Sequence, residues 1–393
     1  MRILNTNTHL DPVTGGGTAE RTFQMSRYLI KSGHHCAILT TDNGMTEARR
    51  VELSATELIA MPCLVDRIFL PHIPVQRVKN AVRTSDILHL MGHWSIVNVI
   101  AYLYARAMSK PYVVCPAGTL NIYGRSTLMK RGFNAVVGTR IIRNASGHIA
   151  ISKDEIDHFA RMGIDRQKIA VIPNGIHIDD YADDDVESFR TQYGIGPNPY
   201  ILYMGRLNYY KGPDLLLEAF GRVKDELRNF KLLVAGPDED MLQWMKKYVA
   251  DHSLEGRVVF LEHISGAQKS RAYHGSEIVV IPSRRDAMSI VVLEAGAVAR
   301  PVILTNKCGF DEVQDVDGGL IVDASVDGIA GGLLEYARNK ERFKKMGENL
   351  QCMTVERYSW DRIIDQLTSY YQEVLDRRGA AIRPAAASDN SPC

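Results

Sequence analysis

No stretch of this sequence is both long and purely apolar. The longest uncharged run extends from Ile87 to Ala105, and it is interrupted by polar residues that would be costly in hydrocarbon, among them His89, His93 and Asn98. The apolar stretch after Met1 is also too short for a signal peptide. The sequence therefore predicts a cytoplasmic protein with no membrane-spanning helix.

Cysteine is scarce, and its spacing fits no metal or disulfide pattern. The six cysteines include no CxxC pair and no histidine at metal-ligand spacing, which argues against a disulfide scaffold and a zinc site. We expect reduced, mostly buried thiols, no metal site and no cofactor. The cysteines are Cys36, Cys63, Cys115, Cys308, Cys352 and Cys393.

An excess of charge of either sign is also missing. With 47 basic and 46 acidic residues the net charge is +1, which gives no reason to expect a nucleic-acid partner. The distribution is uneven, because residues 1–178 carry 21 basic and 12 acidic residues, a net charge of +9. The remaining residues carry −8, so we expect the two halves to meet different partners.

The chain has enough apolar residues for a large core and is too long for one compact domain. Of its 393 residues 45% are apolar and 24% charged, and at roughly 150 residues per domain two domains are expected. Short aliphatic runs alternate with amphipathic helical patterns, which is typical of βαβ units. The pattern restarts after an acidic, turn-rich hinge at 173–185. Predicted strands lie at 2–5, 36–40, 87–91, 112–115, 147–151 and 169–172, then at 200–204, 231–235, 258–261, 278–281 and 302–305.

The predicted fold is therefore α/β, with two Rossmann-like doubly wound domains facing across a cleft. In such sheets ligands bind at the carboxyl ends of the strands. The first loop there contains Gly15, Gly16 and Gly17 ahead of a helical pattern from Thr18. Glycines at a helix start let backbone N–H groups approach an anion, although a plain tight turn would have the same sequence.

The second loop follows the strand at 200–204 and contains Arg206 and Lys211. A guanidinium fork and an ammonium group together suit a diphosphate, and the alternative is a pair of solvated surface cations.

The third loop leads from Ser283 into a helical pattern and carries Asp286, Met288, Ser289 and Glu294. Asp286 and Glu294 are eight positions apart, so they can address different ends of one ligand, with Glu294 accepting ribose hydroxyls and Asp286 facing a sugar. The alternative is a helix capped by Asp286 or Ser289, with Glu294 exposed on its surface.

These motifs together resemble the retaining family 4 glycosyltransferases of the GT-B fold, the glycosyl transferases group 1. The resemblance covers almost the whole chain, and Asp286 to Glu294 matches the family pattern of an acidic residue, seven others and a Glu. Asp stands where the family usually has Glu, and Ala287-Met288-Ser289 replaces the commoner Gly-Phe-Gly. The other matching segments are 15–20, 172–175, 205–212, 234–237, 260–263 and 318–322.

A further match is the stretch from Asp86 to Ser95, which resembles the family's Asp-x-x-His-x-His, with Met91 in place of the second His. His89 within the strand and His93 at its carboxyl end are both candidates for sugar contact. A hydrogen-bonded core histidine is the alternative for His89. The loop at 115–120 resembles the family's Pro-His-Gly loop, with Ala117 for His.

The resemblance implies an acceptor-binding domain at 1–176 and a nucleotide-sugar-binding domain at 177–358. It further implies a helix at 359–376 that packs back on the first domain, and we expect a disordered tail at 377–393. The implied reaction is transfer of a sugar from a nucleotide-diphosphate sugar to an acceptor hydroxyl with retention, without a metal, and with Arg206 and Lys211 neutralising the departing diphosphate.

Two other functions share these features: a nonhydrolysing nucleotide-sugar epimerase, and a nucleotide-sugar-binding protein with impaired catalysis. The basic first half predicts an anionic or lipid-linked saccharide acceptor, as in surface polysaccharide, lipopolysaccharide or glycolipid assembly. It also predicts peripheral contact with the inner face of the cytoplasmic membrane. There Ile73, Val75, Val78 and Val82 would enter the headgroups beside Arg77, Lys79 and Arg83, with Lys130, Arg131, Arg140 and Arg143 near the acceptor loop.

Overall fold

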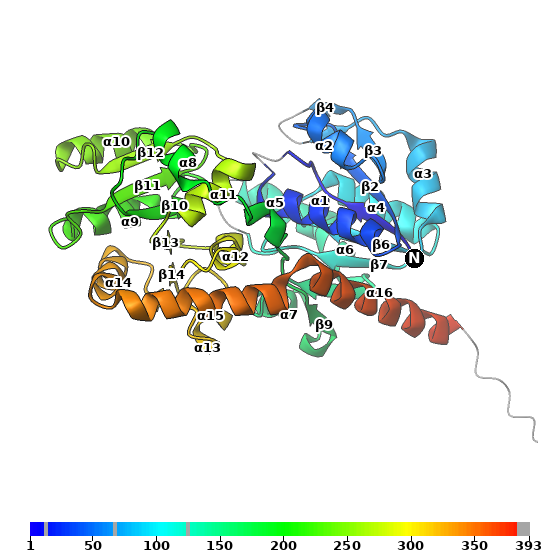
Figure 1. The fold of residues 1–393 in the computed structure, drawn as a ribbon. Helices are drawn as coiled ribbons and strands as arrows, with labels where there is room; N and C mark the ends of the chain where they lie inside the picture. The colour runs from blue at the N-terminus through cyan, green and yellow to red at the C-terminus, as the bar shows by residue number, and fades with distance from the viewer. Residues whose placement is uncertain (12–14, 66–68, 123–125, 383–393) are drawn as a thin grey trace, which may run out of the picture. The chain divides into compact units, whose positions relative to one another are not determined.

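The computed structural model describes residues 1–11, 15–65, 69–122 and 126–382, with the side chains of the last two residues of that range left aside (Figure 1). Residue contacts divide the chain into two units. The first comprises 1–151, 155–172 and the chain from Ile364 onward, and the second comprises 152–154 and 173–363. The predicted domain boundary after residue 176 lies four residues later than this division.

The first unit is built on a parallel sheet with seven strands among the described residues, in the order β3-β2-β1-β6-β7-β8-β9. Adjacent strands are related by helical crossovers, as the alternating pattern predicts. The strands are β1 (Arg2–Thr6), β2 (His35–Thr41), β3 (Glu57–Met61), β6 (Ile87–Met91), β7 (Tyr112–Cys115), β8 (Gly147–Ala150) and β9 (Ile169–Val171). A short antiparallel pair, β4 (Cys63–Val65) and β5 (Leu70–Pro71), lies outside this sheet.

The helices of this unit follow the strands in sequence. They are α1 (Gly16–Lys31), α2 (Glu47–Glu52), α3 (Val75–Thr84), α4 (Ile96–Ala107), α5 (Thr127–Phe133), α6 (Thr139–Arg143) and α7 (Asp154–Arg161). A π-helical turn, η2 (Asn134–Gly138), joins α5 to α6, and a 3-10 turn, η3 (Arg166–Lys168), precedes β9. Val78 and Val82 of α3 are completely buried in the core of this unit.

The second unit repeats the architecture with a parallel sheet of six strands among its described residues, in the order β12-β11-β10-β13-β14-β15. The strands are β10 (Tyr200–Met204), β11 (Lys231–Ala235), β12 (Val258–Leu261), β13 (Ile278–Ile281), β14 (Val302–Thr305) and β15 (Gly319–Val322). The helical elements are η4 (Ile178–Tyr181), α8 (Val186–Gln192), α9 (Pro213–Arg222), α10 (Leu242–Asp251), α11 (Gly266–His274), α12 (Ile290–Ala297), α13 (Glu312–Asp315), α14 (Val326–Arg338) and α15 (Lys340–Tyr358).

The last helix, α16 (Trp360–Ile382), begins in the second unit and belongs to the first from Ile364 onward (Figure 1). The Tyr370 hydroxyl accepts a hydrogen bond from the His148 backbone N–H of β8 at 2.9 Å, and Tyr371 is fully buried. The prediction of disorder from Arg377 was wrong for 377–382, because the helix continues to Ile382. The rest of the predicted tail lies outside the described residues.

Most cysteines are buried, as predicted, in the described part of the chain. Cys36, Cys115 and Cys308 are buried free thiols, Cys63 is partly buried and Cys352 is exposed. No helix among the described residues has the length and apolarity needed to cross a bilayer.

Candidate functional site

The loops after β10 and β13 are neighbours, because these two strands pair in parallel at the centre of the second sheet. Parallel strands present their carboxyl ends at the same edge, so the loop 205–212 and the loop 283–289 emerge together. The Lys211 ammonium donates to the Asp286 carboxylate across this edge, and both side chains are mostly buried. The sequence-predicted cation and carboxylate are therefore in direct contact.

Arg206 does not share that partner. Its Nη1 lies 2.9 Å from Glu239 Oε1, and Asn208 Nδ2 donates to the other carboxylate oxygen of Glu239 at 2.6 Å. Lys211 is thus mostly buried, whereas Arg206 and Glu239 form an ion pair at the surface, with side chains 41% and 42% exposed. In this structure Arg206 and Lys211 point to two different carboxylates.

A pocket lies between the two loops within the second unit. Ser283 and Ser289 line it together with Lys211, and its apolar wall comes from Tyr203, Met204, Ile281, Pro282 and Val291. Ser289 occupies the N-cap position of α12, but its side chain makes no capping hydrogen bond. The helix start next to Lys211 therefore keeps backbone N–H groups that can donate hydrogen bonds to an anion.

Glu294 lies inside α12 and is buried. Its Oε1 accepts from Lys269 Nζ at 2.6 Å, and its Oε2 accepts from the Tyr273 hydroxyl at 2.5 Å. Burial opposes ionisation of this carboxyl, but the Lys269 charge outweighs it and lowers the pKa of Glu294. The alternative of an exposed Glu294 beside a capping serine is therefore wrong, and Glu294 is a buried, ionised carboxylate that already accepts hydrogen bonds from Lys269, Tyr273 and Tyr181.

Met288 is also held inside the protein. Its sulfur accepts the Asn174 backbone N–H at 3.3 Å, and the side chain is almost fully buried. Met288 thereby ties the loop after β13 to the segment 173–175 of the same unit, and its side chain does not line the pocket.

The three glycines at 15–17 differ in whether the structure explains why a glycine is needed there. Gly15 is the N-cap of α1, and a Cβ there would lie 2.4 Å from the Asp11 carbonyl oxygen. Gly16 has a φ of +59°, whereas a Cβ on Gly17 would meet nothing within 4 Å. Packing therefore explains Gly15, and neither packing nor positive φ explains Gly17.

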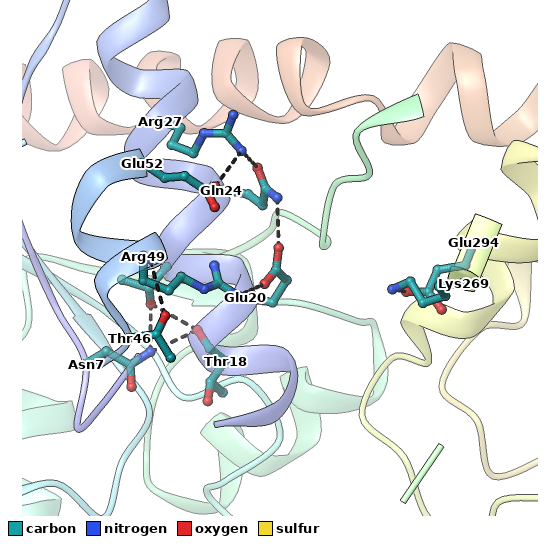
Figure 2. A network of polar contacts seen from close by, with 11 residues as sticks. Asn7, Thr18, Glu20, Gln24, Arg27, Thr46, Arg49, Glu52, Lys269 and Glu294 are labelled. Atoms are coloured by element: carbon teal, nitrogen blue, oxygen red, sulfur yellow. Dashed lines mark hydrogen bonds and ion pairs between the residues drawn. The ribbon is translucent and has the colours of Figure 1, made fainter. Parts of the chain in front are cut away.

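The first turns of α1 are braced by α2. Arg49 Nη2 lies 2.6 Å from Glu20 Oε2, and the Arg49 guanidinium covers the Phe23 ring at 3.7 Å from its centroid. Figure 2 shows Glu20 between Arg49 and Gln24 on one side of α1, and it also draws the Lys269–Glu294 pair of the second unit. The glycine loop thus precedes a helix whose start is fixed.

The two candidate histidines are both inside the first unit. His89 Nδ1 is 2.5 Å from the Tyr371 hydroxyl of α16, and burial lowers the pKa of His89 to about 3. His93 Nε2 is 2.7 Å from Asn134 Oδ1 of η2, and burial lowers its pKa as well. The structure therefore shows His89 as a neutral core histidine and His93 as a nearly buried one beside Trp94 and Phe133.

Several residues of this site were not found by sequence reasoning. Lys269 and Tyr273 precede Glu294 by 25 and 21 positions, and no local periodicity links them to it. Asp214 and Arg284 form an ion pair between the two loop regions of the second unit. In the sequence they could be recognised only as an acidic residue in the first turn of α9 and a basic residue shortly before Asp286. No group of three His, Cys, Asp or Glu side chains that could hold a metal occurs among the described residues.

Two family models match the chain in succession. The model of Glycosyltransferase Family 4 matches residues 15–180, and the model of Glycosyl transferases group 1 matches residues 185–352. Among curated relatives, the D-inositol 3-phosphate glycosyltransferase of Gordonia bronchialis is 28% identical over 98% of this chain and 92% of its own length. An uncharacterized glycosyltransferase of Methanocaldococcus jannaschii is 29% identical over 54% of this chain and 56% of its own length, so the match spans about half of that protein.

Solved structures share the fold at low sequence identity. Anabaena HepE, solved in complex with UDP and glucose, has a TM-score of 0.77 at 17% identity and covers 95% of this chain and 99% of its own. WaaG, a glycosyltransferase involved in lipopolysaccharide biosynthesis, has a TM-score of 0.67 at 16% identity and covers 94% of this chain and 99% of its own. With the two parallel sheets described above, these matches place the chain among the group 1 glycosyltransferases of the family 4 kind, with the GT-B fold.

Proposed function

We propose that this glycosyltransferase transfers a sugar from a nucleoside-diphosphate sugar to an acceptor hydroxyl, with retention of the anomeric configuration. One arrangement carries the proposal: Lys211, Asp286 and the uncapped start of α12 meet beside one pocket in the second unit. A cation and a helix start bind an anion, and a carboxylate within reach binds sugar hydroxyls.

The roles of the donor-site residues follow from their chemistry. Lys211 and the α12 N–H groups receive the diphosphate and stabilise the charge that grows on it as the sugar leaves. Arg206 assists after it exchanges Glu239 for phosphate. Glu294, kept ionised by Lys269, accepts ribose hydroxyls, and Asp286 binds the sugar. Since these cations neutralise the leaving group, the proposal includes no metal.

The comparisons support a nucleotide-sugar donor but leave its identity open. HepE has been solved in complex with UDP and with UDP-glucose, and several curated relatives are D-inositol 3-phosphate glycosyltransferases. We therefore infer a nucleotide donor of this kind for the present chain. A thermal-shift screen of UDP, GDP and ADP sugars would identify the donor, because a ligand that binds only the folded state raises Tm.

The reaction type is tested by its products. With the donor and candidate acceptors, formation of a glycoside whose anomeric proton has the donor's configuration supports the proposal. Inversion at that carbon would overturn retention. Isomerisation of the donor without an acceptor would instead indicate an epimerase, and binding without any turnover would indicate an impaired nucleotide-sugar-binding protein.

The acceptor is proposed to be anionic or linked to lipid, as in surface polysaccharide, lipopolysaccharide or glycolipid assembly at the inner face of the cytoplasmic membrane. The basic first half supports this, but the predicted apolar contact needs correction. Val78 and Val82 cannot enter a headgroup layer, because both pack in the core of their unit. Ile73 and Val75 remain exposed, at 36% and 56%, and a second exposed apolar group next to basic residues lies on α5 and η2: Leu128, Met129 and Val136 are 81%, 62% and 68% exposed. Lys130, Arg131 and Arg140 lie in the same segment.

A further inference from the structure

An ion pair with two parallel hydrogen bonds connects the loops that carry Lys211 and Asp286. Arg284 Nη1 lies 2.8 Å from Asp214 Oδ1, and Arg284 Nη2 lies 2.6 Å from Asp214 Oδ2. The side chains are only 20% and 14% exposed, so water screens them weakly. Paired bonds between a guanidinium and a carboxylate fix orientation as well as distance.

The same arginine is fastened to the β10 loop by three more contacts. Its Nη1 donates to the Tyr209 carbonyl at 2.9 Å, and its backbone N–H donates to the Tyr210 carbonyl at 2.8 Å. Its guanidinium also lies 4.2 Å from the centroid of the Tyr209 ring. The donors and the face of Arg284 are thus engaged with the neighbouring loop, and it is poorly placed to serve as a phosphate ligand itself.

The two backbones are in close contact at the same point. Gly212 has a φ of +67°, and a Cβ there would lie 2.2 Å from the Pro282 carbonyl oxygen. Lys211 precedes this glycine, Asp214 follows it by two positions, and Asp286 follows Arg284 by two. A change in the Arg284–Asp214 pair therefore shifts Lys211 and Asp286 relative to each other.

The geometry points to Arg284 and Asp214 as positioning residues of the donor site. They hold Lys211 where it meets the second phosphate of a nucleoside diphosphate, and they touch neither donor nor acceptor. This inference rests on the proposed donor site. It predicts that the pair contributes to recognition of the second phosphate and not to recognition of the nucleoside.

The test compares a nucleoside diphosphate with its monophosphate. UDP, GDP and ADP are first compared for binding to the whole protein. The affinities of the tightest-binding diphosphate and of its monophosphate are then measured by calorimetric titration. Asp214→Asn keeps the size of the side chain and removes its charge. We expect it to weaken diphosphate binding about tenfold, as for a lost charge-assisted contact, and to leave monophosphate binding within roughly twofold. Arg284→Lys keeps the charge without the fork, so an intermediate loss is expected.

A double-mutant cycle separates positioning from general stability. In a Lys211→Ala background, Asp214→Asn should cause no further loss of diphosphate affinity, because the group it positions is already absent. Asp183→Asn is the matched control. Asp183 forms a similar two-bond pair with Arg271, at 2.7 and 2.9 Å in the same unit, and neither residue belongs to either loop. Because Arg271 is on α11 with Lys269, this control is judged by the ratio of diphosphate to monophosphate affinity, which it should leave unchanged.

The outcomes separate this inference from the proposed function. Equal losses for diphosphate and monophosphate in both Asp214→Asn and Arg284→Lys, or additive losses in the cycle, would overturn the positioning role. If Lys211→Ala removes the preference for diphosphate while the two pair variants keep it, the donor site stands and the inference fails. If no nucleoside diphosphate binds the wild-type protein, the proposed function fails with it.

Discussion

Lys211 has two possible anionic partners, the Asp286 carboxylate and the proposed diphosphate, and in this structure it contacts Asp286. Its ammonium contacts the Asp286 carboxylate, so a diphosphate that approaches Lys211 competes with Asp286 for its charge. With side chains 27% and 15% exposed, the pair contributes about 1 kcal/mol, the upper end of the range for ion pairs that water reaches. The proposed donor site would therefore contain an internal competitor for the free nucleotide, and a sugar that engages Asp286 would relieve the competition.

Asp286→Asn should consequently separate affinity from turnover. We expect roughly fivefold tighter binding of the free nucleoside diphosphate, because about 1 kcal/mol of ion pairing no longer has to be broken. Release of nucleotide from the sugar donor should fall, since the sugar loses its carboxylate. Calorimetry and a turnover assay measure the two effects. Asp251→Asn removes the exposed partner of Lys247 and serves as the control. Weaker nucleotide binding in Asp286→Asn would contradict this account.

His89 makes folding sensitive to mild acid. Because its pKa is about 3 in the folded protein and ordinary, near 6.5, in the unfolded chain, the unfolded state binds the extra proton between these values. Stability is therefore lost as pH falls below 6.5, by up to about 1.4 kcal/mol per pH unit. His89→Gln, whose amide can still bond to Tyr371, should lose less stability than wild type between pH 7 and pH 5 in urea unfolding. An equal loss would show that His89 is not the responsible group.

At the scale of a helix, Gly17 at the start of α1 can be tested for a role in the site separately from its effect on stability. Gly17 lies in the first turn, where a Cβ would meet nothing, so Gly17→Ala should raise the free energy of unfolding by about 0.5–1 kcal/mol. If the backbone there closely approaches an anion, turnover should fall despite this gain. Gly331→Ala on α14, also without a neighbour within 4 Å, should bring the same stabilisation with unchanged turnover. Unchanged turnover in both variants would remove Gly17 from the site.

The strands were predictable where they are buried on both faces. β6, β7, β10, β11, β12, β13 and β14 have the predicted bounds, because short, mostly apolar runs of four or five residues have few other solutions in an α/β protein. β3 was missed because Glu57 and Ala60 dilute its apolar pattern, and the short β4 and β5 are too brief to leave one. The helix at 127–143 was also not predicted, and its π-helical turn has no recognised sequence signal.

The site was predictable as a set of motifs but not as a set of contacts. Sequence spacing predicted Lys211, Asp286 and Glu294 as site residues; in the structure Lys211 contacts Asp286, and Glu294 lies inside α12. The sequence could not show that Glu239 forms an ion pair with Arg206, or Lys269 with Glu294, because ion pairs between distant segments depend on tertiary packing. The prediction of an apolar surface at 73–83 was wrong for Val78 and Val82 for the same reason: both face the core, whereas Ile73 and Val75 remain exposed.

The whole molecule combines a basic first half with an acidic second half, and this asymmetry gives its last prediction. A surface with Leu128, Met129 and Val136 beside Arg131 and Arg140 suits an anionic bilayer, to which near-surface cations contribute roughly 1 kcal/mol each. We expect the full-length protein to sediment with vesicles containing anionic lipid at low salt, and to be released at high salt as the charges are screened.

Two charge-reversed variants locate that contact. Arg131→Glu with Arg140→Glu should abolish sedimentation with anionic vesicles. Lys246→Glu with Lys247→Glu on α10 changes the net charge equally in the second unit and should leave sedimentation unchanged. Both pairs are exposed, so neither change requires the core to adjust. Equal release in the two variants would mean that net charge alone drives binding, and equal sedimentation of the wild-type protein with neutral vesicles would exclude a charge-driven contact. The glycosyltransferase assignment depends on neither result, because it rests on the family match and on the two parallel sheets.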